Sequence, residues 1–204
     1  GIKKIVRDGG PSFTKGPNGD LNKYLEHQMK RLDRLAKTDP DRYWKLAQHL
    51  LRSSKALRIV AIRNVRPHWY KSVPADKVLE WMRELNGICY RPRETFEIQR
   101  TAIPKDDGTK RYINDPGVPW RMYLWMWNFM LHFFLKDRIN PSQHGHRPGK
   151  GSVTCWREIL DNVQGYKYIY EFDYKKFHDL IGRKFLLQSL LNYKFPEDVA
   201  IKLV

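Results

Sequence analysis

The sequence predicts a mixed α+β fold in which a helical N-terminal part precedes a β-hairpin and a further strand. Apolar residues between 21 and 86 recur every three or four positions, as in amphipathic helices. Residues 96–113 alternate apolar and polar side chains on both sides of an Asp-Asp-Gly turn, as in a hairpin. Residues 166–173 are rich in Tyr, Ile and Phe, which favour strands. The 204 residues suffice for one core and a small appendage.

Three apolar stripes predict the N-terminal helices. The first, at 21–35, ends at Thr38-Asp39-Pro40, where a second helix begins. The second stripe, at 43–51, continues into residues 55–62, whose period fits either a helix or a strand. The third helix starts at Pro74 and is expected to stop at Asn86-Gly87. Residues 1–20 contain many Gly and Pro residues and are expected to form a flexible arm.

The charge of the chain indicates a polyanionic partner. There are 38 Lys+Arg against 22 Asp+Glu, a net charge of +16. Such an excess attracts nucleic acid, because neutralising phosphates releases counterions. The aromatic content of 13% argues against disorder throughout the chain. Cys89 and Cys155 are isolated, so a structural zinc site or a redox pair has no support, and both cysteines are expected to be reduced core residues.

An aromatic helix is predicted at 119–135, after the turn at Asp115-Pro116-Gly117. Its length and its polar residues Arg121, Asn128 and His132 argue against a membrane span, which needs about 20 mostly apolar residues. We therefore expect a helix that is buried on most sides, and no membrane partner.

Three segments in the second half carry motifs. Residues 103–111 read Ile-Pro-Lys-Asp-Asp-Gly-Thr-Lys-Arg, and the hairpin can direct Lys105 and Arg111 the same way. Residues 143–152 form a basic, glycine-rich loop, a type that can bind phosphate through backbone amides. Asp173 ends the strand predicted at 166–173.

In this order and spacing, the three segments resemble the reverse transcriptases of group II introns. The first is similar to the family's I-P-K-x-x-G-x-x-R segment, the second to S-H-G-F-R-P-G-R-S, and the third to polymerase motif A. The resemblance covers residues 88–182. It implies a right-hand polymerase fold, with the fingers and the first part of the palm at 88–204 and a basic helical N-terminal extension at 21–87.

The resemblance also implies roles for the matching residues. Asp173 would be catalytic and a ligand of Mg²⁺, since nucleotidyl transfer uses divalent ions held by carboxylates. The residues expected to bind the nucleoside triphosphate are Lys105, Arg111, Arg147 and His178. Those expected to bind the RNA template or structured intron RNA are Lys110, Arg121, His144 and Lys150.

The sequence departs from the family at two places. His178 stands where the family has Phe or Tyr, a ring that excludes the ribose 2′-OH, so the choice between deoxy- and ribonucleotides is open. After Asp173 the sequence reaches Val204 without the Tyr-x-Asp-Asp turn and thumb that the family needs. We therefore expect no polymerisation by this chain alone, and expect a C-terminal segment or a separate chain to complete the palm.

Three interpretations follow. The chain is the N-terminal part of an RNA-directed DNA polymerase, whether as a fragment or as half of a split enzyme. Alternatively, it is a non-catalytic RNA-binding maturase or ribonucleoprotein subunit that keeps the fold. A more distant alternative is a fragment of a viral RNA-directed RNA polymerase. A mitochondrion or a bacterial cytoplasm would suit an intron-type protein.

Overall fold

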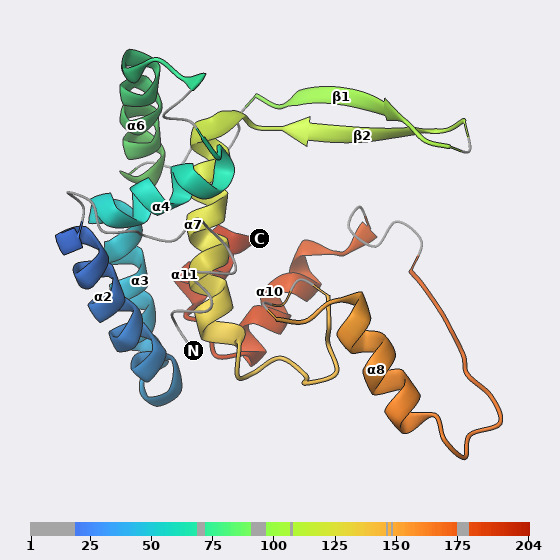
Figure 1. The fold of residues 1–204 in the computed structure, drawn as a ribbon. Helices are drawn as coiled ribbons and strands as arrows, with labels where there is room; N and C mark the ends of the chain where they lie inside the picture. Colours follow the sequence, from blue (N-terminus) through green and yellow to red (C-terminus); the bar gives the residue numbers. More distant parts are fainter. Residues whose placement is uncertain are drawn as a thin grey trace.

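The computed structural model of the chain describes residues 19–68, 72–90, 97–106, 108–145, 147, 149–174 and 180–204, with backbone only for 19–24. Within these residues the elements are mostly helices, together with a two-stranded antiparallel sheet (Figure 1). A mixed α+β composition is thus confirmed, and the right-hand polymerase fold stays a prediction.

The described N-terminal part is helical, and capping residues set the starts of two of its helices. Its helices include α2 (Gly19–Thr38), α3 (Pro40–Ser53), α4 (Lys55–Val65) and α6 (Ala75–Tyr90). Asp39 caps α3, because its side chain accepts a hydrogen bond of 3.0 Å from the backbone N–H of Arg42. Ser54 caps α4 by accepting from the N–H of Leu57 at 3.2 Å. The predicted boundary between the first two helices is therefore confirmed, and the ambiguous residues 55–62 are helical.

The third helix extends further than predicted. We expected it to stop at Asn86-Gly87, but α6 continues to Tyr90. Ile88 and Cys89 are buried beyond the glycine. Burial of these side chains outweighs the cost of about 1 kcal/mol for a glycine inside a helix, so tertiary packing overrides the local stop signal.

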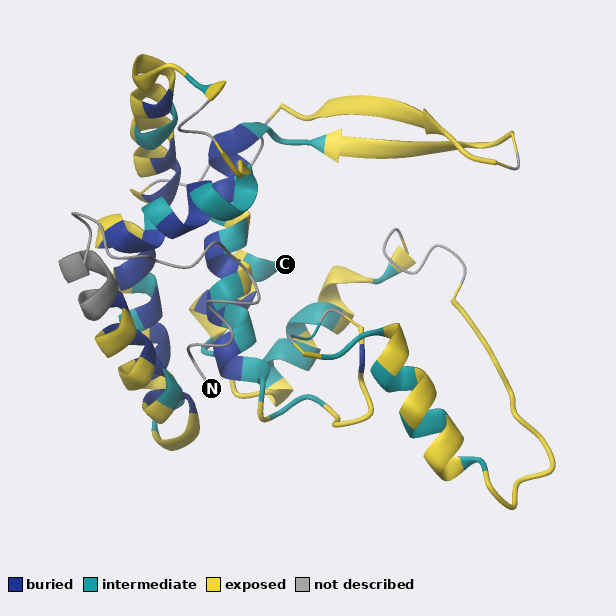
Figure 2. Ribbon diagram, viewed as in Figure 1, coloured by how far each residue is buried: buried dark blue, intermediate teal, exposed yellow. Residues whose placement is uncertain are grey.

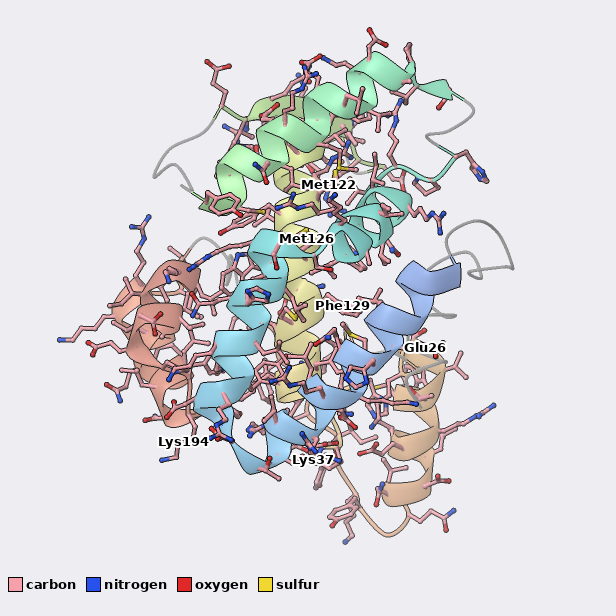
Figure 3. All side chains as sticks on the ribbon, turned by 90° about the vertical axis from the view of Figure 1, so that its left-hand side faces the viewer. Glu26, Lys37, Met122, Met126, Phe129 and Lys194 are labelled. Carbon is pink, nitrogen blue, oxygen red and sulfur yellow. The ribbon has the colours of Figure 1, made fainter. Side chains whose placement is uncertain are left out.

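The aromatic helix α7 (Gly117–Leu135) lies at the centre of the core (Figure 1). Its buried residues include Met122, Met126 and Met130, and Figure 3 shows the first two, with Phe129, along this helix. It packs against α2, α3, α4 and α6. The prediction of a helix buried on most sides is confirmed. No helix of the described residues is both long and apolar enough to cross a membrane.

An aromatic cluster connects distant parts of the chain. The ring of Trp44 in α3 lies 5.1 Å from that of Phe134 in α7 and 4.9 Å from that of Phe195. Phe195 and the buried Val199 bring the C-terminal residues into the same core. This core therefore includes residues on both sides of the boundary predicted at 87/88, and the division into two domains stays a prediction.

The predicted hairpin is confirmed as β1 (Gln99–Pro104) paired with β2 (Lys110–Asp115). It projects from the helical core and is exposed along almost its whole length (Figures 1 and 2). A hairpin with both faces open offers its side chains to a partner rather than to the core.

The described C-terminal part includes the helices α8 (Ser152–Asn162), α10 (Arg183–Asn192) and α11 (Glu197–Leu203). The strand predicted at 166–173 is wrong, because residues 166–174 form an extended, exposed segment outside any sheet of the described residues (Figure 2). A strand needs a neighbour to satisfy its backbone groups. Within the described residues, none pairs with this segment.

Candidate nucleic-acid interface

The register of the hairpin sorts its cations onto two faces. Ile103 pairs with Arg111, and paired residues point to the same face of the sheet. The N–H of Lys105 donates to the carbonyl of Thr109 at 2.8 Å, which continues the pairing beyond the strand ends. Since side chains alternate along a strand, Lys105 shares a face with Ile103 and Arg111. The two predicted nucleotide-binding cations therefore lie on one face.

The opposite face carries Lys110, paired with Pro104, and Tyr112, paired with Ala102. The guanidinium of Arg100 lies on the same face, 4.0 Å from the centre of the Tyr112 ring. Such a cation–π contact stabilises an exposed hairpin by about 0.5–1 kcal/mol. Lys110, predicted to bind RNA, is thus directed away from Lys105 and Arg111.

The turn of the hairpin requires glycine at residue 108. Its φ of +77° lies in the left-handed region, which side chains with a Cβ rarely adopt. Its N–H donates to the carbonyl of Lys105 at 3.1 Å and closes the turn. The Asp-Asp-Gly pattern thus places Lys105 at the start of the turn, although Asp107 lies outside the described residues.

Arg121, predicted to contact RNA, lies where the hairpin joins α7. Its Nε atom is 3.4 Å from a carboxylate oxygen of Asp115, and the two side chains are about two-fifths exposed. The same oxygen, Oδ1 of Asp115, also accepts a hydrogen bond of 2.9 Å from the backbone N–H of Gly117. This arrangement anchors the base of the hairpin to the first turn of α7, and RNA contact by Arg121 stays a prediction.

The glycine-rich loop is organised by its own cations. Arg147 donates from Nη1 to the carbonyls of Asn140 at 3.0 Å and Gln143 at 3.3 Å, and from Nη2 to that of Lys136 at 3.4 Å. Lys150 donates to the carbonyl of Pro141. Both side chains thus hold the backbone of residues 136–143, and their predicted contacts with nucleotide and RNA stay predictions.

His144 fastens this loop to α8. It is buried, with Nε2 2.8 Å from a carboxylate oxygen of Glu158 and Nδ1 2.8 Å from the hydroxyl of Thr154. Because a carboxylate only accepts, the bond to Glu158 needs a hydrogen on Nε2. Hydrogen bonds from Ser142 and from His144 hold the pKa of the Glu158 carboxyl below its usual value. His144 therefore links the loop to α8 in this fold, and its contact with RNA stays a prediction.

Asp173 lies at the surface of the described structure. It lies in the extended segment 166–174 with its side chain exposed. In the part of the chain that the structure describes, no three His, Cys, Asp or Glu side chains gather closely enough to hold a metal ion. The described residues alone therefore do not complete a Mg²⁺ site, and the role of Asp173 as a ligand of Mg²⁺ stays a prediction. His178, predicted to contact the nucleotide, lies outside the described residues.

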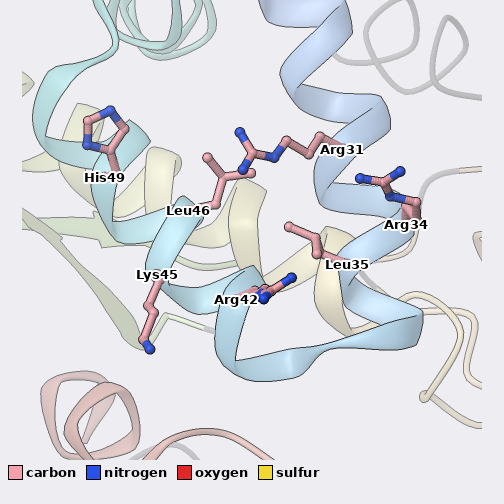
Figure 4. Close-up of a pocket in the computed structure, with 7 residues that line it drawn as sticks. All are labelled: Arg31, Arg34, Leu35, Arg42, Lys45, Leu46 and His49. Atoms are coloured by element: carbon pink, nitrogen blue, oxygen red, sulfur yellow. The ribbon is translucent and has the colours of Figure 1, made fainter.

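The structure also shows a cationic groove that the sequence did not predict. It runs between α2 and α3 and has a volume of about 450 Å³ (Figure 4). Its lining residues are Arg31, Arg34, Leu35, Arg42, Lys45, Leu46 and His49. The sequence of the two helices predicts only that they are amphipathic, and the helical periodicity places Arg31 and Arg34 on one face of α2. Which residues of α3 would lie opposite depends on how the helices pack.

The chain has no match among models of protein families, curated proteins or solved structures. Its function is therefore argued from the residues and their arrangement.

Proposed function

We propose that this chain supplies the fingers and the first palm motif of an RNA-directed DNA polymerase of the group II intron type. It binds an RNA template and the incoming nucleoside triphosphate, and a further segment or a separate chain completes the palm and thumb. The observation that carries the proposal is the shared face of Lys105 and Arg111 on an exposed hairpin.

The chemistry of this face suits a triphosphate. A lysine ammonium acts as a compact charge, whereas an arginine guanidinium can donate two parallel hydrogen bonds to phosphate oxygens. Both side chains are exposed, and no described carboxylate forms an ion pair with either of them. Their donors are thus available to a ligand, which supports nucleotide binding at the hairpin.

The polymerase needs carboxylates in addition to Asp173. Phosphoryl transfer between nucleotides uses two divalent ions held by several acidic ligands. Asp173 is exposed and brings one carboxylate, and the described residues contain no group of three acidic, His or Cys side chains that could hold a metal ion. In the proposed enzyme the completing segment provides the other ligands of Mg²⁺.

Primer extension on an RNA template tests this proposal. The purified chain is assayed alone and together with its native complex, with deoxy- and ribonucleotides in separate reactions. We expect extension only in the complex, lost in Asp173→Asn and kept in Asp161→Asn, which removes a carboxylate from α8 instead. Extension that persists in Asp173→Asn would show that this aspartate has no catalytic part.

A second candidate is a non-catalytic RNA-binding maturase or ribonucleoprotein subunit. The exposed position of Asp173, which belongs to no group of three potential metal ligands among the described residues, favours it. This function predicts no extension in either sample. It also predicts tight, salt-sensitive RNA binding that is unchanged in Asp173→Asn.

A further inference from the structure

We propose that the groove between α2 and α3 is a second RNA site, which binds the phosphate backbone independently of the hairpin. This inference rests on the proposed function only in taking RNA as the partner. The groove lies on the helical core, whereas the hairpin tip extends away from that core (Figure 1).

The rim of the groove is cationic on both sides. Arg31 and Arg34 stand on α2, and Arg42, Lys45 and His49 stand on α3, all with exposed side chains (Figure 4). Among the described side chains, no carboxylate lines the groove. Cations on both helices can therefore contact an anion that lies along the groove.

Most of these cations form no ion pair with a described carboxylate. Arg42 is the exception, since its Nε atom lies 3.3 Å from a carboxylate oxygen of Asp39. No ion pair with a described carboxylate involves Arg31, Arg34 or Lys45. Their charges repel one another until an anion neutralises them, so a polyanion gains both contacts and relief of repulsion.

The cationic row continues along α2. A neighbouring hollow of about 600 Å³ is lined by His27, Lys30, Arg31 and Arg34, so it shares two arginines with the groove. At 1.5 Å per residue, the row from His27 to Arg34 extends for about 10 Å. This length suits consecutive phosphates of a chain better than a single phosphate ion.

The floor of the groove argues for RNA over a membrane surface. The apolar residues Leu35 and Leu46 lie at the base, with Leu35 almost fully buried, while the cations stand above them. A helix that binds a bilayer presents its apolar face outward to enter the acyl boundary. Here Leu35 is buried, Leu46 is only partly exposed, and five basic side chains surround them, so the groove presents no broad apolar face to a bilayer.

The test compares two triple variants of the full chain that lose the same charge. The groove variant is Arg31→Gln, Arg34→Gln and Lys45→Gln. The matched control is Lys55→Gln, Arg83→Gln and Arg157→Gln, which alters exposed cations outside the groove. Binding of a fluorescent RNA duplex with a single-stranded overhang is measured at several salt concentrations, and circular dichroism checks folding.

We expect the groove variant to lose at least tenfold in affinity at 0.1 M salt and the control to lose much less. The slope of log affinity against log salt should become shallower by about 2, because each lost phosphate contact removes 0.7–0.9. A third variant, with Arg31→Lys and Arg34→Lys, keeps the charge and should retain most of the binding.

The other outcomes overturn the proposal and separate it from the proposed function. Equal losses in the groove variant and the control would show that only net charge matters. If the groove variant binds RNA like the wild type while Lys105→Gln with Arg111→Gln weakens nucleotide binding, the groove proposal fails and the proposed function stands. If the wild type does not bind RNA but binds phosphatidylserine vesicles through the groove residues, both the groove proposal and the proposed function fail.

Discussion

The hydroxyl of Tyr43 donates a hydrogen bond of 2.6 Å to the carbonyl of Met130, and this buried bond ties α3 to α7. Burial raises the pKa of the Tyr43 hydroxyl well above its usual value, so the group stays protonated and able to donate. The ring lies 5.1 Å from that of Phe134, so the polar and aromatic contacts act together.

We expect Tyr43→Phe to lower the free energy of unfolding by about 1 kcal/mol. The ring contacts remain, and only the hydroxyl bond is lost, which for a chain of this size lowers the melting temperature by about 2–4 °C. Thermal unfolding by circular dichroism measures the shift. A melting temperature equal to that of the wild type would mean that the bond contributes nothing to stability.

The helices could be predicted because their signals are local. The 3.6-residue period and the Thr38-Asp39-Pro40 boundary depend only on neighbouring residues. The error at Gly87 arose because Ile88 and Cys89 are buried, which no local pattern shows. The strand predicted at 166–173 failed for a similar reason, since a strand needs a pairing partner that lies elsewhere in the sequence.

The candidate site could be predicted only in part. The Asp-Asp-Gly turn predicted the hairpin, and its register then follows, so the shared face of Lys105 and Arg111 was within reach of the sequence. The contacts of Arg147 with backbone carbonyls could not be predicted from the sequence, because they depend on the path of an irregular loop. The same holds for the groove, which exists only when α2 and α3 pack together.

A pH dependence of stability is expected from His132. Burial, followed by the charges of Arg147 and Lys136, lowers the pKa of this imidazole in the folded state below its ordinary value of 6.5. Between the two pKa values the unfolded chain binds more protons, so stability rises with pH there. The contribution of His132 is thus complete above pH 6.5 and is lost as the pH falls through the lowered pKa.

Urea unfolding of the wild type and of His132→Asn at pH 8, 6.5 and 5 measures this effect. We expect the wild type to lose stability relative to the variant on acidification, because Asn does not titrate. His27→Asn, an exposed position on α2, serves as the control and should follow the wild type. Parallel curves for the wild type and His132→Asn would contradict the assignment.

Arg147 is expected to hold the loop at 136–143 through its guanidinium rather than its charge. Arg147→Lys keeps the charge but loses the fork that reaches the carbonyls of Asn140, Gln143 and Lys136. Each lost bond costs about 0.5–1.5 kcal/mol. Hydrogen exchange at the amide of Gln143, which donates to the carbonyl of Asn140, should accelerate about tenfold for a loss near 1.4 kcal/mol. Arg157→Lys on α8 should leave this amide unchanged, and equal exchange in both variants would disprove the role.

The two faces of the hairpin are expected to differ in their effect on nucleotide binding. Lys105→Gln with Arg111→Gln removes two charges from one face, and Arg100→Gln with Lys110→Gln removes two from the other. In the complete polymerase, the first pair should raise the KM for the deoxynucleotide at least tenfold, because a hydrogen bond to a charged group contributes about 1.5–3 kcal/mol. The second double variant loses the same two charges as the first. It should leave this KM within about twofold, since the substituted side chains point away from the triphosphate.

Primer extension at varied nucleotide concentration gives the KM of both variants. Equal increases would mean that the hairpin acts through its overall charge and that its register does not select the nucleotide-binding face.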